Sequence, residues 1–440
     1  MSGYGSYYLR DNPFPETAVI DPLSPDIRMN GSIFHEGIFS NEIEALRKKT
    51  EQGVNVVYIA GFKFVRGTGK SALMINHLMR LRKISGSTCV YVSCSKEDKP
   101  RDIAKRAVEQ WHSAGYLWES FKRAFLEFSE GRSDPLLAPD AVRELFKAFP
   151  KAPDRLPLSR YTHSRDHKKI ANAFAGWASN KIKTSAPSLV VLADSYLSAP
   201  SEFCESIKGK SVDSIALYEG CSRFLASFGY SRHYVFFDQF EDMIMGTTKA
   251  GMAKFALDMK GIIRASSGAA SIFVTLHPDS ENRLRLQTAQ DMTGVAPLDT
   301  VHRIDVMILD TKGDSAIHLA EEYFKHFRVG DSPYPTYPVE PELLEFMCYL
   351  ERGLIRRFLQ LLHNALAYSI GNGYPELTME YARTHSTDIL GKEIDQKTID
   401  DFNTHKGRPV APVTTGRSWA NTVKDFKEAR SRQPGPYREP

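Results

Sequence analysis

Long apolar runs, paired cysteines and a strong net charge are all missing from this sequence of 440 residues. No stretch of about 18 uncharged apolar residues occurs, so we predict no membrane-spanning helix and no membrane partner. The five cysteines include no Cys-x-x-Cys pair, which argues against zinc and redox motifs and favours a reducing compartment. The N-terminal stretch MSGYGSYYLRDNPFPE lacks a basic region followed by an apolar core, so we expect a cytoplasmic protein. The net charge of +4 permits a nucleic-acid partner without requiring one.

Short runs of β-branched and aromatic residues predict five strands of a parallel sheet, and therefore an α/β fold. Such runs are apolar at nearly every position, as in strands that helices cover on both faces. The predicted strands cover residues 54–60, 88–93, 233–238, 270–278 and 301–309. Residues 188–194 (SLVVLAD) remain open between a short strand and the start of a buried helix.

The remaining segments differ in composition and periodicity, which predicts four parts. They are an extended N-terminal arm at 1–30, a core at 31–312 with a helical insertion at about 95–230, a helical domain at 313–395, and a basic, flexible tail at 396–440. Within these parts, Ser40 is the expected N-cap of a helix, and residues 159–169 are a polar, basic loop. The Pro-rich segment 332–342 is the favoured domain boundary.

A glycine-rich loop, GTGKS at 67–71, follows the first predicted strand and precedes a predicted helix. This context is typical of a phosphate-binding loop, in which backbone amides at a helix N-terminus cradle phosphate. Lys70 would contact the β- and γ-phosphates, and Ser71 would hold Mg²⁺. The full set of predicted nucleotide-binding residues is Arg66, Gly67, Thr68, Gly69, Lys70, Ser71 and Ala72.

The loop departs from the pattern G-x-x-x-x-G-K-[ST] at one position, because Phe64 stands where the first glycine belongs. That position accepts a side chain if the turn that leaves the strand opens slightly. Two alternatives stay open: the motif is a chance match in a surface loop, or the loop is the remnant of a site that no longer binds nucleotide.

Acidic residues follow the third predicted strand in the stretch YVFFDQFED. Asp238 ends a buried strand, where an uncompensated carboxylate is costly, so we expect it to bind Mg²⁺ directly or through water. Glu241 is the candidate general base, since Gln239 occupies the position where a water-activating glutamate often stands. The alternative is that Glu241 caps the helix that follows.

The fourth predicted strand ends in the polar residues Thr275 and His277. A polar group there would orient water or contact the γ-phosphate, and both residues are candidate catalytic residues. For His277 the alternative is an ordinary hydrogen-bonding role in a turn before Pro278.

These motifs together resemble the AAA+ ATPases of the initiator (origin-recognition) group and the related STAND NTPases, over about residues 12–370. The motifs that carry the resemblance are NPFPE, IFSNEIEAL, GTGKS, FFDQFED, VTLHP and RGLIRRFLQLLHNAL. The resemblance implies an AAA+-like P-loop NTPase core, a C-terminal helical lid, ATP and Mg²⁺ as cofactors, and a homo-oligomer. Two departures are Asn41, where the family has arginine, and the position of Asp238, which lies 168 residues after Lys70, about a hundred more than in a compact AAA+ domain.

Arginines acquire expected roles through this resemblance. Arg356 would be the lid arginine that touches the γ-phosphate, with Arg357 as the fallback. Arg303 lies just before the fifth predicted strand, where the family places the arginine finger given to a neighbouring subunit. Arg283 and Arg285 compete with Arg303 for that role, and a surface arginine without a role is the alternative for each of the three.

Two hypotheses of function follow. The first is an oligomeric ATPase that acts on or with DNA, as an initiator, transposition or defence protein. It draws on the basic and aromatic mixture in 105–125 and 159–169, which suits phosphate contacts and base stacking but equally suits an amphipathic helix with a buried aromatic face. The second is a nucleotide-controlled switch or scaffold with slow or no hydrolysis, which binds protein partners of the same system.

Overall fold

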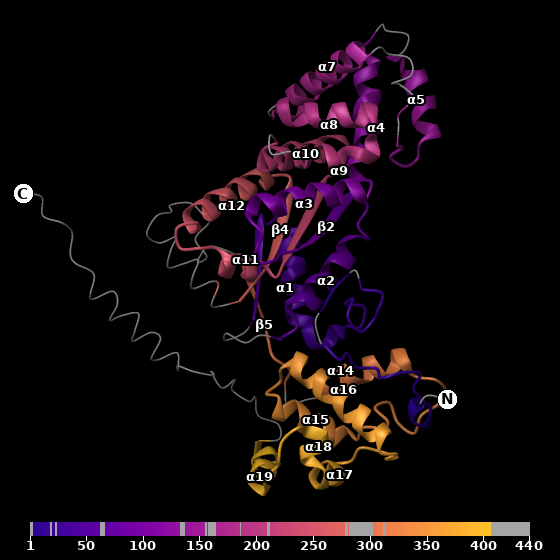
Figure 1. Ribbon diagram of the computed structural model, residues 1–440, viewed down its shortest axis with the longest axis vertical. Coiled ribbons are helices and arrows are strands. Elements are labelled where there is room, and N and C mark those ends of the chain that lie inside the picture. The colour runs from indigo at the N-terminus through magenta and orange to yellow at the C-terminus, as the bar shows by residue number, and fades with distance from the viewer. Residues whose placement is uncertain are drawn as a thin grey trace, which may run out of the picture. The chain divides into compact units, whose positions relative to one another are not determined.

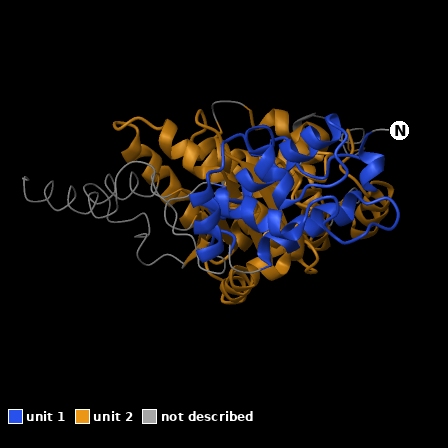
Figure 2. Ribbon diagram, turned by 90° about the horizontal axis from the view of Figure 1, so that it is seen from below, with its two compact units in different colours: residues 1–18, 62–68, 307–440 blue, residues 19–61, 69–306 orange. Residues whose placement is uncertain are grey.

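The computed structural model describes residues 3–17, 20–22, 24–61, 67–132, 137–154, 156, 164–184, 186–208, 212–277, 280, 302–310 and 314–405. The chain forms two compact units, coloured separately in Figure 2. Unit 1 comprises residues 1–18, 62–68 and 307–440, and unit 2 comprises residues 19–61 and 69–306. Among the described helices, none combines the length and apolar character needed to cross a membrane.

Unit 2 contains a five-stranded sheet in which every neighbouring pair is parallel, in the order β2-β3-β4-β1-β5 (Figure 1). All five predicted strands are confirmed. Their bounds are β1 (Val56–Gly61), β2 (Ser87–Ser93), β3 (Arg232–Asp238), β4 (Ala270–Leu276) and β5 (His302–Val306). Because the strands are parallel, their carboxyl ends meet at one edge of the sheet.

Helices cover both faces of this sheet, which explains why the strands are apolar throughout. On one face, His77 of α2 contacts the stacked rings of Phe236 and Phe273. On the other face, Trp111 of α3 lies against His233 of β3. The covering helices are α1 (Ser40–Glu51) and α2 (Lys70–Leu81) on the first face, and α3 (Pro100–Ser113), α10 (Ser214–Phe228) and α12 (Met252–Ser266) on the second.

Helix α1 begins differently from the prediction. A 3-10 turn, η2 (Glu36–Phe39), leads directly into α1, so Ser40 already has helical dihedral angles and does not serve as an N-cap. His35 caps the 3-10 turn instead, because its Nδ1 accepts a hydrogen bond from the amide of Ile38 at 3.3 Å.

The predicted insertion is helical in the part of it that the structure describes (Figure 1). Residues 188–194 belong to a helix, since Leu189, Leu192, Ala193 and Tyr196 recur at helical spacing and are all buried. The prediction of a loop at 159–169 is wrong from Ser164 onward, where a long helix begins. The bounds are α4 (Tyr116–Glu130), α5 (Pro139–Ala148), α7 (Ser164–Ile182), α8 (Ala186–Ser198), η5 (Pro200–Glu202) and α9 (Phe203–Ser206).

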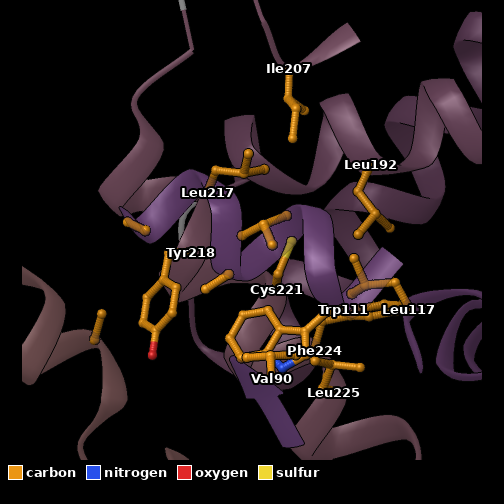
Figure 3. Close-up of a cluster of buried hydrophobic side chains, with 14 of the residues drawn as sticks. Val90, Trp111, Leu117, Leu192, Ile207, Leu217, Tyr218, Cys221, Phe224 and Leu225 are labelled. Carbon is orange, nitrogen blue, oxygen red and sulfur yellow. The ribbon is translucent and has the colours of Figure 1, made fainter. Parts of the chain in front are cut away.

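The aromatic side chains of segment 105–125 are core residues. Trp111 stacks on Tyr218 with ring centroids 5.2 Å apart, inside the cluster drawn in Figure 3. Trp118, Phe121 and Phe125 are equally buried. Base stacking by these four rings, one basis of the nucleic-acid hypothesis, is therefore excluded, because no base can reach them.

Unit 1 is helical, and it includes the first 18 residues of the predicted N-terminal arm, whereas residues 19–30 belong to unit 2. The arm opens with a 3-10 helix, η1 (Gly3–Tyr7), rather than extended chain. Leu9 forms an antiparallel bridge with Arg328, and Phe14 contacts Tyr323 and Phe324. The helices are α14 (Ser315–Phe327), α15 (Pro341–Leu350), α16 (Ile355–Gly371), α17 (Met379–Thr384), α18 (Ser386–Leu390) and α19 (Gln396–His405).

Two boundaries in unit 1 differ from the expectation. The Pro-rich segment 332–342 lies inside this unit, between α14 and α15, and the guanidinium of Arg328 donates to its carbonyl groups at Pro335 and Tyr337. Helix α19 occupies the first ten residues of the segment predicted as a tail. The remainder, 406–440, lies outside the described residues.

We predict that unit 2 loses stability in mild acid, because it contains two buried histidines. Burial lowers the pKa of His77 and of His233 to about 4, and each ring bonds a threonine hydroxyl, Thr50 and Thr88 respectively, at 2.9 Å. In the unfolded chain the two histidines take up protons near their ordinary pKa of 6.5, whereas in the folded chain they do not. The free energy of unfolding therefore decreases as the pH is lowered from about 6.5 to 4. Each histidine contributes about 2 kcal/mol to the loss between pH 7 and 5.

Urea denaturation at pH 7 and pH 5, followed by tryptophan fluorescence, measures this difference. His77→Gln and His233→Asn keep a polar nitrogen near the bonded ring nitrogen but do not titrate. Each should reduce the difference between the two pH values by about 2 kcal/mol. An unchanged difference in both variants would show that other groups cause the acid sensitivity.

Candidate functional site

The carboxylate of Asp238 is the centre of the candidate site, at the carboxyl end of β3. Its side chain is only 1% exposed. Oδ1 accepts hydrogen bonds from the Ser71 hydroxyl at 3.1 Å, the Thr275 hydroxyl at 2.8 Å and the Gln239 amide at 2.9 Å. Oδ2 accepts a hydrogen bond from the Tyr91 phenol at 2.6 Å. Donors from several elements thus meet at one buried anion.

Strand register explains why these groups meet. Ser93 pairs with Asp238 across β2 and β3, and Phe237 pairs with Val274 across β3 and β4. The next position on β4 is Thr275, which therefore lies beside Asp238. Alternate residues of a strand share a face, so Asp238 projects to the same face as Phe236, which α2 covers.

Helix α2 brings Lys70 and Ser71 to this edge. It begins at Lys70, directly after Gly69, which has φ of 94° and lies in the left-handed region that favours glycine. The amide groups of the first helical turn have no partner within a helix, and with the helix dipole they form a site suited to an anion. Ala72 lies in the same turn, and Lys70 is largely buried.

Glu241 lies near this cluster, in the first turn of α11 (Phe240–Gly246). The Thr275 hydroxyl is 2.8 Å from Asp238 and 3.4 Å from Glu241 Oε2, and its single proton therefore bonds Asp238. Burial raises the pKa of Glu241, and the positive charge of Lys70 opposes that rise. Glu241 is thus a carboxyl group with an acceptor oxygen close to the metal-binding candidates.

Gln239 connects β3 to α11 in a left-handed conformation, with φ of 54°. This conformation costs a non-glycine residue about 1–3 kcal/mol unless neighbours stabilise it. The backbone amide of Gln239 donates to both Asp238 Oδ1 and Thr275 Oγ1 at 2.9 Å, and these bonds stabilise the turn. The turn sets the direction in which α11 leaves the sheet.

The other candidates in unit 2 are less closely connected. His277 follows β4 and is buried, and its carbonyl accepts a hydrogen bond from the Ser280 hydroxyl at 2.6 Å. Arg303 was expected before the fifth strand but is the second residue of β5, and it forms an ion pair with Asp305 at 2.8 Å. The predicted residues Phe64, Arg66, Arg283 and Arg285 lie outside the described residues.

In unit 1, Gly67 contacts the start of α16. The amide of Arg356 donates to the carbonyl of Gly67 at 3.2 Å. Gly67 has φ of 84°, and a Cβ there would lie 2.9 Å from the Cβ of Arg356, so both the backbone and the neighbour favour glycine. Gly353, at φ 71°, has a similar constraint, because a Cβ would lie 2.4 Å from the carbonyl oxygen of Leu309. Thr68 is buried, and Arg357 is exposed.

Tyr91 is the site residue that the sequence analysis missed. Its only signal was its place in the second predicted strand, and an apolar-rich strand often contains a tyrosine. The sequence did not indicate that β2 is the neighbour of β3, and that neighbourhood alone brings Tyr91 to Asp238.

The residues present fit a magnesium ion. A hydroxyl and a carboxylate lie 3.1 Å apart, and Mg²⁺ prefers such hard oxygen ligands. Protein sites for Mg²⁺ often supply only one or two ligands and leave the others to water and phosphate. In the described part of the chain no group of three His, Cys, Asp or Glu residues is placed to hold a metal ion.

Comparisons with known proteins add little to this geometry. No protein-family model matches the chain, and no curated protein matches its sequence. A solved structure that matches is the Walker-type ATPase PABY2304 of Pyrococcus abyssi, at 12% identity and a TM-score of 0.36, covering 90% of this chain and 76% of that chain. A likeness at that TM-score supports no inference, so the assignment of the site depends on its residues.

We predict that removing the hydroxyl of Thr275 destabilises the protein, because this group makes several hydrogen bonds. Thr275→Val keeps the shape but removes a donor to the buried carboxylate and an acceptor for the Gln239 amide. The free energy of unfolding should fall by about 1–3 kcal/mol. Thr275→Ser, which keeps the hydroxyl, should lose less in urea denaturation. Equal losses in the two variants would show that the methyl group, not the hydroxyl, stabilises the strand end.

Proposed function

We propose that this protein binds ATP with Mg²⁺ and hydrolyses it. The observation that carries the proposal is the 3.1 Å contact between the Ser71 hydroxyl, in the first turn of the helix after a glycine-rich loop, and the buried carboxylate of Asp238 at a strand end. A phosphate bound at the N-terminus of α2 would place a second anion beside the Asp238 carboxylate, and a cation shared between the two offsets their repulsion. Metal-bound phosphate supplies that combination.

Each residue then has a defined task. The amides of the loop and of the first turn of α2 hold phosphate oxygens, and Lys70 neutralises the β- and γ-phosphates. Ser71 and Asp238 hold Mg²⁺, which supplies charge stabilisation to the phosphates when bound. Glu241 accepts a proton from the attacking water, and Thr275 keeps Asp238 and the Gln239 turn in place.

Hydrolysis is preferred over the alternative of a nucleotide-controlled switch because of the position of Glu241. Its carboxylate is in contact distance of Thr275, itself bonded to Asp238. A pKa raised by burial brings a carboxyl group nearer to the operating pH, which improves a general base. The switch would instead require a bound nucleotide that persists without turnover.

The resemblance also suggests how the protein assembles and which partners it has. By the resemblance, the ATPase is a homo-oligomer of initiator or STAND type, with Arg356 contacting the γ-phosphate and Arg303 or a competitor as the finger. A role with DNA now depends mainly on charge, since four rings of segment 105–125, those of Trp111, Trp118, Phe121 and Phe125, are buried. Many cations of the insertion have acidic partners; examples are Lys122 with Glu119, Lys147 with Glu144 and Lys181 with Glu127.

Three substitutions test the proposal through nucleotide binding and phosphate release. Lys70→Ala removes the cation at the phosphates and should weaken ATP binding about 10- to 100-fold. Asp238→Asn should weaken binding only when Mg²⁺ is present. Glu241→Gln should bind ATP normally but hydrolyse it at least about 100-fold more slowly. Binding is measured with a fluorescent ATP analogue, and hydrolysis by release of phosphate.

Lys83→Ala and Glu97→Gln are matched controls, because each removes a charge of the same sign from an exposed residue that has no bond to the cluster in the described part of the chain. Both should behave like the wild type. Failure of the wild type to bind ATP would refute the proposal. Tight binding without turnover in the wild type would favour the switch, and normal turnover in Glu241→Gln would remove this residue from the base role.

A further inference from the structure

We propose that Tyr91 is a positioning residue that orients the metal-binding carboxylate of Asp238. This inference rests on the proposed function, because it names how that same site controls its affinity for Mg²⁺. Neither sequence motif of the site, the phosphate loop or the acidic strand, includes a residue of β2.

The sheet brings the tyrosine to the carboxylate. Tyr91 pairs with Phe236 across β2 and β3, and Ser93 pairs with Asp238. Tyr91 and Ser93 project to the same face, as do Phe236 and Asp238. The phenol therefore extends along that face toward the carboxyl edge, and its hydroxyl donates to Asp238 Oδ2 at 2.6 Å.

The two oxygens of the carboxylate have different partners. Oδ1 accepts from Ser71, Thr275 and the Gln239 amide, whereas the described residues offer Oδ2 one side-chain donor, Tyr91. The terminal torsion of aspartate is broad, so donors to one oxygen alone leave the plane of the group poorly defined. A donor to the second oxygen fixes that plane and keeps Oδ1 directed at Ser71.

The bond between the Tyr91 phenol and Asp238 Oδ2 is short, at 2.6 Å. Hydrogen bonds between a hydroxyl and a carboxylate at 2.5–2.7 Å are charge-assisted and about twice as strong as those between neutral groups, so this bond can hold the carboxylate in one orientation.

Outer groups that orient a metal ligand change metal affinity without contacting the metal, and their loss typically costs about 10- to 100-fold. Tyr91→Phe removes the hydroxyl and keeps the ring. The concentration of Mg²⁺ that half-saturates binding of the fluorescent ATP analogue should rise at least about 10-fold. Binding of the analogue without Mg²⁺ should be unchanged, because in this mechanism Tyr91 acts only through the carboxylate that holds the metal.

Tyr218→Phe is the matched control. It also removes a buried phenol that is hydrogen-bonded, in this case to Ser266 at 2.8 Å, on the opposite face of the sheet. Its requirement for Mg²⁺ should equal that of the wild type. Thermal unfolding of both variants and of the wild type shows how much stability each hydroxyl contributes.

Three results would overturn the inference. The first is that the half-saturating concentration of Mg²⁺ for Tyr91→Phe lies within twofold of the wild-type value. The second is that Tyr218→Phe raises this concentration as much as Tyr91→Phe does. The third is that Tyr91→Phe no longer folds while Tyr218→Phe does. The last would assign the hydroxyl to stability. Mg²⁺-dependent binding by the wild type tests the proposed function by itself, so normal wild-type binding with an unshifted Tyr91→Phe refutes only the role of Tyr91.

Discussion

A carboxylate buried at a strand end must be compensated, and the compensation of Asp238 determines the arrangement of the carboxyl edge of the sheet. Its donors come from α2, β2, β4 and the turn that leads into α11. Such a cluster forms only when β3 lies between β2 and β4 and when α2 covers the correct face. The strand order, the position of α2 and the burial of Asp238 are therefore linked, and a change in one alters the hydrogen bonding of the carboxylate.

The backbone at Gln239 is a consequence of the same anion. The backbone amide of Gln239 points at the Asp238 carboxylate. That orientation requires a left-handed backbone conformation at Gln239, which is unfavourable for any residue other than glycine. The turn then directs α11 so that its first turn, with Glu241, returns to the sheet edge. Backbone strain at Gln239 and the placement of the candidate base thus have one common cause, the hydrogen bond to Asp238.

The sequence predicted the strands and the local motifs because both depend on short-range patterns. Apolar runs identified all five strands, and GTGKS with FFDQFED identified Lys70, Ser71 and Asp238 as candidates. Strand order depends on long-range pairing, which no local pattern encodes, and so Tyr91 was missed. The short run 188–194 was ambiguous for a related reason: a short apolar run fits either a buried strand or the start of a buried helix until the full length of the element, Ala186–Ser198, is known.

The helical insertion shows why composition alone is a poor guide to a nucleic-acid surface. Basic and aromatic residues alternate in segment 105–125 because an amphipathic helix needs both, one set for the core and one for solvent. Burial of Trp111, Trp118, Phe121 and Phe125 removes the stacking contribution, which is independent of salt, and acidic partners reduce the free positive charge. A contact between nucleic acid and the cations of these helices would be electrostatic and would weaken steeply as the salt concentration rises.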